Sequence, residues 1–285
     1  MINVLFAVAF LVLAPILGGL IAGIDRKLTA RMQGRVGPPV LQPFYDVGKL
    51  LEKEHVIVSV SQNFFVLAYL VFIAFSGALF FAGGDLLLVV FALTLAHVLL
   101  VLGAYSATSP YSFIGAEREL VQLMAYEPMV ILAAAGFYLA TGSFSVMEIA
   151  AFPRPLIAVL PGIFIGLFYV LTMKLRKSPF DIATSHHAHQ EIVKGVTTEF
   201  SGSTLGMVEV AHWYETVFLL GLFWLFFAWS PVIAVIALAI LYLAEIFIDN
   251  ATARVRWGFA LRSIWAVTLV LSAANLVWLQ YFGGL

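Results

Sequence analysis

Residues Phe64–Tyr105 read FFVLAYLVFIAFSGALFFA, then GGD, then LLLVVFALTLAHVLLVLGAY. Each of the two apolar runs is long enough to cross the hydrocarbon core of a bilayer, which takes about 20 predominantly apolar residues in a helix. The Gly83-Gly84-Asp85 link between them consists of turn-forming residues, so the two helices are expected to lie antiparallel. This stretch therefore predicts a helical hairpin that spans a membrane.

The whole chain has the composition of a membrane protein. Of its 285 residues, 62% are hydrophobic and 11% are charged, and the mean hydropathy is +1.03. Soluble domains are about 45–50% apolar and about 25% charged, so a soluble core could not hide this much apolar surface. A β-barrel would show short alternating strands, whereas the apolar runs here are long and continuous. The expected fold is all-α, a polytopic transmembrane helical bundle.

Eight apolar runs have spanning length, and we expect them to form a single transmembrane domain over residues 1–285. Their bounds are Ile2–Ile24, Phe64–Ala82, Leu86–Tyr105, Leu120–Ala140, Leu156–Met173, Leu205–Ala228, Val232–Ile248 and Ser263–Phe282. The amino-terminal run lacks a basic leader and a small-residue cleavage pattern, so it is expected to be a retained span. Long charged connections follow the first and fifth spans, at Asp25–Asn63 and Lys174–Thr204.

The basic residues predict the orientation of the bundle. Of the 15 Lys and Arg residues, all but Arg154 lie in or beside the connections that follow odd-numbered spans. Cytoplasmic loops carry the excess of Lys and Arg, so these connections are expected in the cytoplasm and both termini outside. The net charge of −1 gives no reason to expect a nucleic-acid partner. With no cysteine, the chain cannot ligate iron–sulfur clusters or form disulfides.

The first long connection combines a turn with a second helix. Glycine and proline are dense between Gly34 and Pro43, so the chain must turn sharply there. After Pro43, the residues Phe44, Val47, Leu50 and Leu51 recur at helical spacing, which predicts an amphipathic helix at the membrane interface with its charged face toward water. The connection is either a membrane-surface loop with basic anchors or a docking surface for a cytoplasmic partner.

Glu127 lies near the middle of the predicted fourth span, and Pro128 follows it. A carboxylate at that depth is costly, so it should face the bundle interior and be paired or protonated. It is either a structural buried acid or part of a proton or ion relay, and the relay is preferred. Glu119 is expected at the mouth of the same span, beside Arg118.

The sixth span carries Glu209, His212 and Glu215 at successive three-residue steps, which place them on one stripe of a helix. Histidine titrates near neutral pH, so the stripe suits proton handling, the alternative being an amphipathic stretch near a membrane boundary. In the seventh span, Glu245 shares a face with Asp249. We therefore predict relay roles for Glu119, Glu127, Glu209, His212, Glu215 and Glu245.

The second long connection contains His186, His187, His189 and Glu191. These side chains could ligate zinc, but their spacing matches no metal-binding motif, and a polar loop surface is the preferred interpretation. No Gly-rich phosphate loop or catalytic triad occurs in the sequence. The chain is therefore expected to have no active site or metal of its own.

Five motifs carry a family resemblance. They are Asp25-Arg26-Lys27, Leu41-Gln42-Pro43 with Asp46 and Lys49-Leu50, Gln122 with Ala125-Tyr126-Glu127, Pro179-Phe180-Asp181, and Thr198-Glu199-Phe200-Ser201-Gly202. In this order and between these spans, they resemble subunit 1 of NADH:quinone oxidoreductase over nearly the whole chain. The compressed stretch 37–43, the histidine-rich stretch 185–191 and His212 look more like the branch found in energy-converting, membrane-bound nickel–iron hydrogenases.

The resemblance implies a non-catalytic coupling subunit in the plasma membrane of a prokaryote. It would join a cytoplasmic arm of hydrogenase-like large and small subunits to antiporter-like membrane subunits, with ferredoxin as the electron donor. The nickel–iron centre and the iron–sulfur clusters would lie in those partners, and the acceptor would be protons or a related species such as polysulfide. Glu127 matches the family's buried acid. The residues that match its cytoplasmic cavity and docking loops are Arg26, Lys27, Arg35, Gln42, Asp46, Pro179, Phe180, Asp181, Glu191 and Glu199, and we place His186, His187 and His189 in the same loops.

Two other functions remain open at this point. In a quinone-reducing member of the superfamily, the two long cytoplasmic connections would cover a quinone pocket. In a free-standing ion transporter no docked arm would be needed, although the concentration of charge in the cytoplasmic loops argues for one.

Overall fold

The computed structural model describes residues 2–54, 59–184 and 192–282, and this part of the chain is helical, with no strand. Seven of the described helices are long and apolar enough to cross a membrane, which confirms the all-helical membrane fold. They are α1 (Ile2–Met32), α3 (Val60–Phe81), α4 (Leu86–Tyr105), α5 (Pro110–Thr141), α9 (Gly202–Trp224, continued by the 3-10 turn Leu225–Phe227), α10 (Pro231–Ala251), and a helix made of α11 (Trp257–Val267), the π-helical turn Thr268–Ala273 and α12 (Ala274–Phe282).

The predicted fifth span is broken into two helices. Only Leu160 separates α7 (Leu156–Val159) from α8 (Pro161–Lys174). Pro161 has no N–H to donate, and it disfavours the helical conformation at Leu160, whose φ and ψ are −121° and 47°. α8 is apolar but only 14 residues long, which is shorter than the about 20 residues of a full span.

Two helices extend beyond the apolar runs that predict them. α1 continues to Met32, so Asp25, Arg26 and Lys27 are helical and do not begin a loop. α5 starts at Pro110 and not at Leu120, so Glu119 lies inside the helix and not at its mouth. Hydropathy marks only the part of a helix that lipid or protein surrounds. Charged residues such as Arg, Lys and Glu are good helix formers, and they carry both helices further.

The amphipathic helix predicted after Pro43 is confirmed as α2 (Gln42–Glu52). Pro43 occupies its first turn, where the missing N–H costs nothing, and Val47 is buried. Lys49 is exposed, as predicted, and so is Leu51. α2 packs against α9 and the second half of α1.

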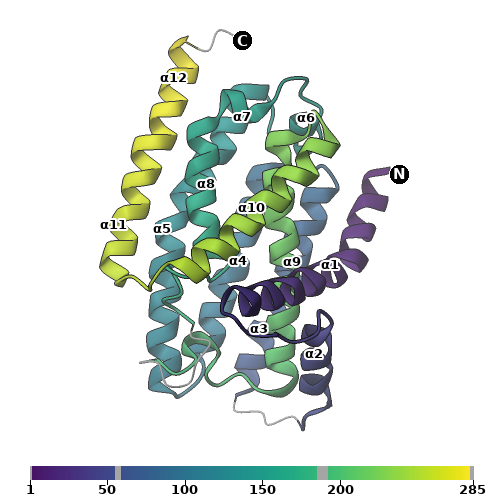
Figure 1. Ribbon diagram of the computed structural model, residues 1–285, viewed down its shortest axis with the longest axis vertical. Helices are drawn as coiled ribbons and strands as arrows, with labels where there is room; N and C mark the ends of the chain where they lie inside the picture. Colours follow the sequence, from purple (N-terminus) through teal and green to yellow (C-terminus); the bar gives the residue numbers. More distant parts are fainter. Residues whose placement is uncertain (1, 55–58, 185–191, 283–285) are drawn as a thin grey trace.

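The helices are arranged so that α1 and α10 lie across an upright group formed by α3, α4, α5, α8 and α9 (Figure 1). α1 bends in its course, and it contains Pro15 and the pair Gly18-Gly19, which are the usual causes of helix bends. Its second half, which carries the charged residues, crosses α9 and approaches α10. α11 and α12 stand at the other side of the molecule, where α11 lies beside α5.

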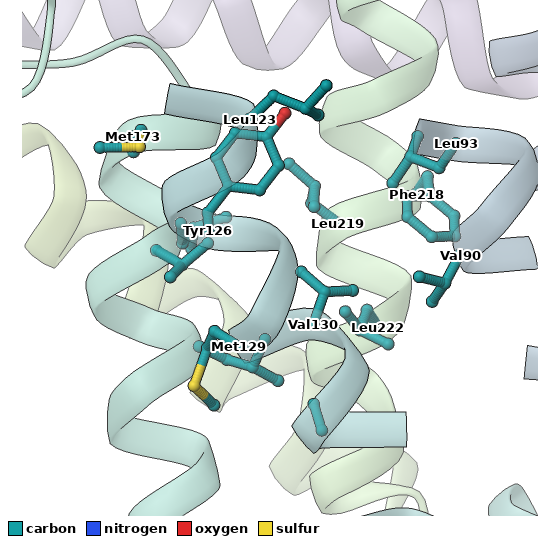
Figure 2. Packing of buried hydrophobic residues seen from close by; sticks show 14 of the residues in the cluster. Val90, Leu93, Leu123, Tyr126, Met129, Val130, Met173, Phe218, Leu219 and Leu222 are labelled. Atoms are coloured by element: carbon teal, nitrogen blue, oxygen red, sulfur yellow. The ribbon is translucent and has the colours of Figure 1, made fainter. Parts of the chain in front are cut away.

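An apolar layer joins α4, α5 and α9 in the centre of the upright group (Figure 2). We define this apolar layer by Val90, Leu93, Val130, Phe218 and Leu222, all of which are buried. Glu215 lies one helical turn from Phe218 on α9, so the layer begins directly beside a charged group. On the side of Glu215 toward the start of α4, the surroundings are therefore hydrocarbon, and the apolar side chains there enclose a small cavity of about 20 Å³.

Candidate functional site

A cavity of about 740 Å³ lies among the second half of α1, α9, α10 and the segment that follows α8. We call it the polar cavity. Its acidic, basic and histidine lining residues are Asp25, Arg26, Arg35, Lys174, Arg176, Lys177, Asp181, Lys194, Glu209, His212, Glu215, Asp249 and Arg254. The volume falls in the range of about 300–1,000 Å³ of small-molecule sites, but such sites are mostly lined by apolar residues. A cavity with this many charges is suited to hold water and to move protons or ions.

Glu215 is the most buried of the charged residues that line the polar cavity. Its Oε1 lies 2.9 Å from Nε2 of His97 on α4 and 3.7 Å from Nζ of Lys174 at the end of α8. The three side chains are each at most 4% exposed. Removing a buried charge from water is costly unless opposite charges and hydrogen bonds replace the water, so the carboxylate and its two partners depend on one another.

The hydrogen bonds of His97 define where a proton is held. Its Nδ1 lies 2.9 Å from the carbonyl oxygen of Leu93, which can only accept, so Nδ1 carries a hydrogen. Nε2 then either donates to ionised Glu215 as part of an imidazolium, or accepts from the protonated carboxyl group. In both cases the pair holds one proton between the two residues. The geometry thus places a hydrogen bond between His97 and Glu215 in a buried position.

Lys174 is further held by an aromatic ring. Its Nζ lies 4.0 Å from the centre of the Tyr126 ring, a distance at which the ring face attracts a cation. Tyr126 precedes Glu127 on α5, and its ring also lies edge-on to His97 with 6.3 Å between the ring centres. The ammonium group is therefore fixed between an acid from α9 and an aromatic side chain from α5.

The segment that begins at Lys174 connects three helices through its basic residues. Besides Lys174 with Glu215 on α9, Arg176 pairs with Glu119 on α5 at 3.0 Å. Lys177 pairs with Asp25 on α1 at 2.6 Å. We call Lys174, Arg176 and Lys177 the basic hub. Because each cation is largely buried, a charge change at one pair acts on the others through a low-dielectric region.

α10 closes the polar cavity with further contacts to the same segment. The Tyr242 hydroxyl donates to Asp25 at 2.9 Å, and the Ser178 backbone N–H donates to Asp249 at 2.8 Å. Just beyond α10, Arg254 pairs with Asp181 at 2.6 Å. These bonds fix α1, α10 and the segment after α8 relative to one another around the cavity.

The predicted stripe on α9 faces the polar cavity, where Glu209, His212 and Glu215 all contribute to the lining. Glu119 joins the same charged region through Arg176. Glu127 does not line the cavity. It is half-buried on α5 and accepts a hydrogen bond from the Thr94 hydroxyl of α4. The relay roles of these residues remain a prediction.

Glu245 is fully buried on α10 and lies outside the lining of the polar cavity. Thr172 of α8 donates to its Oε1 at 3.2 Å, and its Oε2 has no hydrogen-bond partner. A buried oxygen without a partner is costly for a carboxylate. The hydrogen bond from Thr172 connects α10 to α8 at Glu245.

The predicted docking residues of the first connection surround the start of α2. Arg26 pairs with Asp46 at 2.7 Å, and Gln42 donates to the same carboxylate at 2.8 Å. Burial alone would raise the pKa of Asp46, but the hydrogen bonds from Arg26 and Gln42 hold it below its ordinary value. Arg35 bonds to Gln33 and lines the polar cavity, while Lys27 is exposed.

The docking residues of the second connection differ in their burial. Phe180 is buried, and its carbonyl accepts from Gln122 at 2.7 Å. Pro179 and Glu199 are half-buried. His186, His187, His189 and Glu191 lie outside the described residues, so their predicted place in the docking loop stays a prediction. Within residues 2–54, 59–184 and 192–282, no group of three or more His, Asp or Glu side chains could hold a metal ion.

The sequence interpretation missed His97 and the roles of the basic hub. His97 stands alone in the apolar run of α4, and an ionisable residue inside a spanning helix is itself a signal of function. Lys174, Arg176 and Lys177 entered only as charges that set the orientation. Nothing in the sequence indicates that each takes its acid from a different helix.

Known proteins resemble this chain in sequence over nearly its whole length. A sequence profile described as NADH dehydrogenase matches residues 3–280. Hydrogenase-4 component C of Escherichia coli (strain K12) is 28% identical over an alignment of 313 positions, which covers 99% of this chain and 97% of that protein. A subunit of the NADH-quinone oxidoreductase of Geobacillus kaustophilus (strain HTA426) is 29% identical over an alignment of 315 positions, which covers 97% of this chain and 93% of that protein.

Among solved structures, a chain of the membrane-bound sulfane sulfur reductase, an archaeal respiratory membrane complex, superposes with a TM-score of 0.84. It is 26% identical, and the match covers 97% of this chain and 99% of that chain. The profile and the relatives each extend over nearly the whole sequence. The chain therefore belongs to the NADH dehydrogenase family, as a multi-pass membrane subunit of the complex-I-related type.

Proposed function

We propose that this chain is the membrane-anchor and coupling subunit of a ferredoxin-linked, membrane-bound hydrogenase or a closely related sulfur-reducing complex. Two electrons from reduced ferredoxin would convert two protons to hydrogen, or reduce a sulfur species, in a cytoplasmic arm. The energy released would move H⁺ or Na⁺ outward. The observation that carries the proposal is the polar cavity, whose lining includes Lys174 and Glu215 of the buried His97–Glu215–Lys174 cluster.

The partners in this proposal are hydrogenase-like large and small subunits and antiporter-like membrane subunits. The similarity to hydrogenase-4 component C and to a chain of the sulfane sulfur reductase complex supports them. A chain without cysteine needs such partners for electron transfer, so the nickel–iron centre and the iron–sulfur clusters belong to the cytoplasmic arm. The basic, partly exposed residues around α2 and the polar cavity are the surface on which that arm would dock.

The coupling step in this chain would be electrostatic. A change of charge at the docked arm, or a proton that arrives in the polar cavity, alters the field at the basic hub. Because proton affinities of buried carboxylates respond strongly to neighbouring charges, the proton shared by His97 and Glu215 would shift between them or leave. In this proposal, protons pass between the His97–Glu215 pair and the polar cavity by way of Glu119, Glu209 and His212. The altered electric field would then act on Glu127, which contacts α4, and on Glu245, which contacts α8.

The membrane topology belongs to the same proposal. We count eight spans, with α7 and α8 together as the fifth, in one transmembrane domain over residues 1–285. The distribution of Lys and Arg supports an orientation with the polar cavity toward the cytoplasm and both termini outside. This orientation would let the docked arm reach the cavity directly.

A quinone-reducing complex is the second candidate function. The cavity volume of about 740 Å³ and the similarity to an NADH-quinone oxidoreductase component favour it. The charged lining favours the first candidate, because a quinone ring requires apolar contact surface. Purification of the native complex and identification of its subunits by mass spectrometry, together with assays of hydrogen, sulfide and quinol formation, separate the two.

A variant of Glu127 tests the relay. In inverted membrane vesicles, Glu127→Gln should leave ferredoxin-dependent turnover measurable and lower the number of ions moved per electron. If hydrogen production persists and ion movement equals that of the unmodified complex, Glu127 has no role in the relay. Ion flux through the chain expressed alone would instead indicate a free-standing transporter.

A further inference from the structure

A second, smaller cavity lies on the side of the molecule opposite α1, between α5 and α11. Its volume is about 180 Å³, and its apolar wall consists of Val121, Ala125, Met173, Ile182, Ala260 and Leu261. We call it the α5–α11 pocket. The amide of Gln122, which also borders it, is occupied by a hydrogen bond to the Phe180 carbonyl. The interior of the pocket is therefore suited to hydrocarbon and not to water.

The size of the α5–α11 pocket limits what it can hold. An apolar cavity of about 150 Å³ in a protein stays dry and binds benzene, so this pocket can take a segment of an acyl chain. From Glu117 to Ala125 the pocket follows α5 for about 12 Å, given a rise of about 1.5 Å per residue. The pocket is thus elongated along the helix, as the binding of an acyl chain requires.

The rim of the α5–α11 pocket carries an arginine, Arg118, whose Nη1 donates to the Ile182 carbonyl at 3.3 Å. Arg256 directly precedes the lining residue Trp257 and is exposed. The acid at this rim, Glu117, accepts a hydrogen bond from Tyr105 at 2.8 Å.

Trp257 lines the pocket directly after Arg256 in the chain and is 58% exposed. Tryptophan is enriched at the level of lipid headgroups, and basic pockets between membrane helices on the cytoplasmic side bind anionic lipid headgroups. We propose that the α5–α11 pocket binds one anionic phospholipid, with part of an acyl chain between α5 and α11 and its phosphate at the arginine rim.

The test places a photoreactive residue in the pocket wall. The full-length chain carrying p-benzoylphenylalanine in place of Val121 is purified in its native assembly and reconstituted with equal amounts of phosphatidylglycerol and phosphatidylcholine. After illumination, mass spectrometry identifies the adduct. The expected product is the chain linked mainly to phosphatidylglycerol. Equal yields from both lipids, an adduct with another subunit, or no adduct would each overturn the proposal.

Two further variants separate pocket filling from loss of fold. In the same assay, Ala260→Leu should reduce the lipid adduct because Ala260 is 2% exposed in the pocket wall. The matched control Ala239→Leu, at an exposed position on α10, should leave it unchanged. The variant Arg256→Gln alters only an exposed side chain and should reduce the preference for phosphatidylglycerol. Retention of that preference would contradict the assignment of the phosphate to this rim.

Discussion

Glu215 illustrates how one residue can unite several helices. Its carboxylate contacts a histidine of α4 and Lys174 of α8. The segment that begins at Lys174 carries two further cations, Arg176 and Lys177, which pair with acids of α5 and α1. In such a buried group, removal of one charge leaves the other without compensation. The same dependence that stabilises the cluster makes it responsive to a change of charge in the polar cavity.

The interdependence can be measured with a pair of variants. Glu215→Gln keeps the side-chain shape but leaves Lys174 buried without its acid, and we expect a loss of about 3–5 kcal/mol in the free energy of unfolding. The double variant Lys174→Met/Glu215→Gln removes both charges and should recover most of that loss. Denaturant unfolding of the purified assembly measures both. A double variant no more stable than Glu215→Gln alone would show that the two residues are not coupled.

At the level of residues, the sequence predicted the stripe of Glu209, His212 and Glu215 because helical spacing fixes which side chains share a face. It could not predict that Glu215 meets His97, which is 118 positions away. That contact depends on how α4 and α9 pack, and a single sequence does not contain this information.

At the level of elements, close approach of helices depends on glycine. A Cβ added at Gly18 of α1 would lie 2.4 Å from the Trp213 carbonyl oxygen on α9. A methyl group there requires the two backbones to separate. Small residues at such crossings allow membrane helices to pack tightly, and here the crossing positions the charged half of α1 beside the polar cavity.

Two glycine substitutions distinguish this packing from helix propensity. Gly18→Ala should destabilise the protein by about 1–3 kcal/mol through overpacking. Gly48 of α2 has no neighbouring atom within 4 Å of an added Cβ, so Gly48→Ala should be neutral or stabilise the helix by up to about 1 kcal/mol. Thermal unfolding of both variants provides the comparison. Equal effects would contradict the close crossing of α1 and α9.

The apolar layer is the second feature at the level of elements, and a variant of Phe218 tests whether it blocks water and protons. Phe218 is 2% exposed, so Phe218→Ala should cost about 3–5 kcal/mol of stability. It should also raise passive proton leak in proteoliposomes, because water gains a path beyond Glu215. Phe91 is 57% exposed on α4, and Phe91→Ala should do neither. A leak rate equal to that of the unmodified protein would show that Phe218 does not seal the cavity.

The elements were predictable where one physical signal dominates. Long apolar runs gave the spanning helices, and the spacing after Pro43 gave α2. The charged end of α1 and the first turns of α5 were missed because hydropathy carries no signal outside the apolar core. The break at Leu160 follows from Pro161, but continuous hydrophobicity from Leu156 to Met173 concealed it.

At the level of the whole molecule, most of the charge lies at one end of the bundle. The polar cavity, the basic hub and the docking surface share one end, while the apolar layer separates them from the other. A subunit that couples a cytoplasmic arm to ion movement requires this division. The proposed orientation then places the polar cavity on the cytoplasmic side.

The orientation can be tested with single cysteines, because the chain has none of its own. With a membrane-impermeant maleimide, Thr197→Cys at the polar cavity should be labelled only in inside-out vesicles. Ser143→Cys, in the link between α5 and α6 (Val146–Ala150), should be labelled only in intact cells with the outer surface accessible. Leu222→Cys in the apolar layer should be labelled in neither preparation. The opposite pattern at positions 197 and 143 would reverse the topology.

The most direct test of the account is the number of ions moved per electron by the Lys174→Met/Glu215→Gln variant. The assembled complex is reconstituted in proteoliposomes, and reduction of the terminal acceptor and ion uptake are followed together. If the buried cluster couples the two processes, electron transfer should continue while ion uptake falls toward the level of uncoupled vesicles. An unchanged ratio of ions to electrons would contradict a coupling role for the cluster.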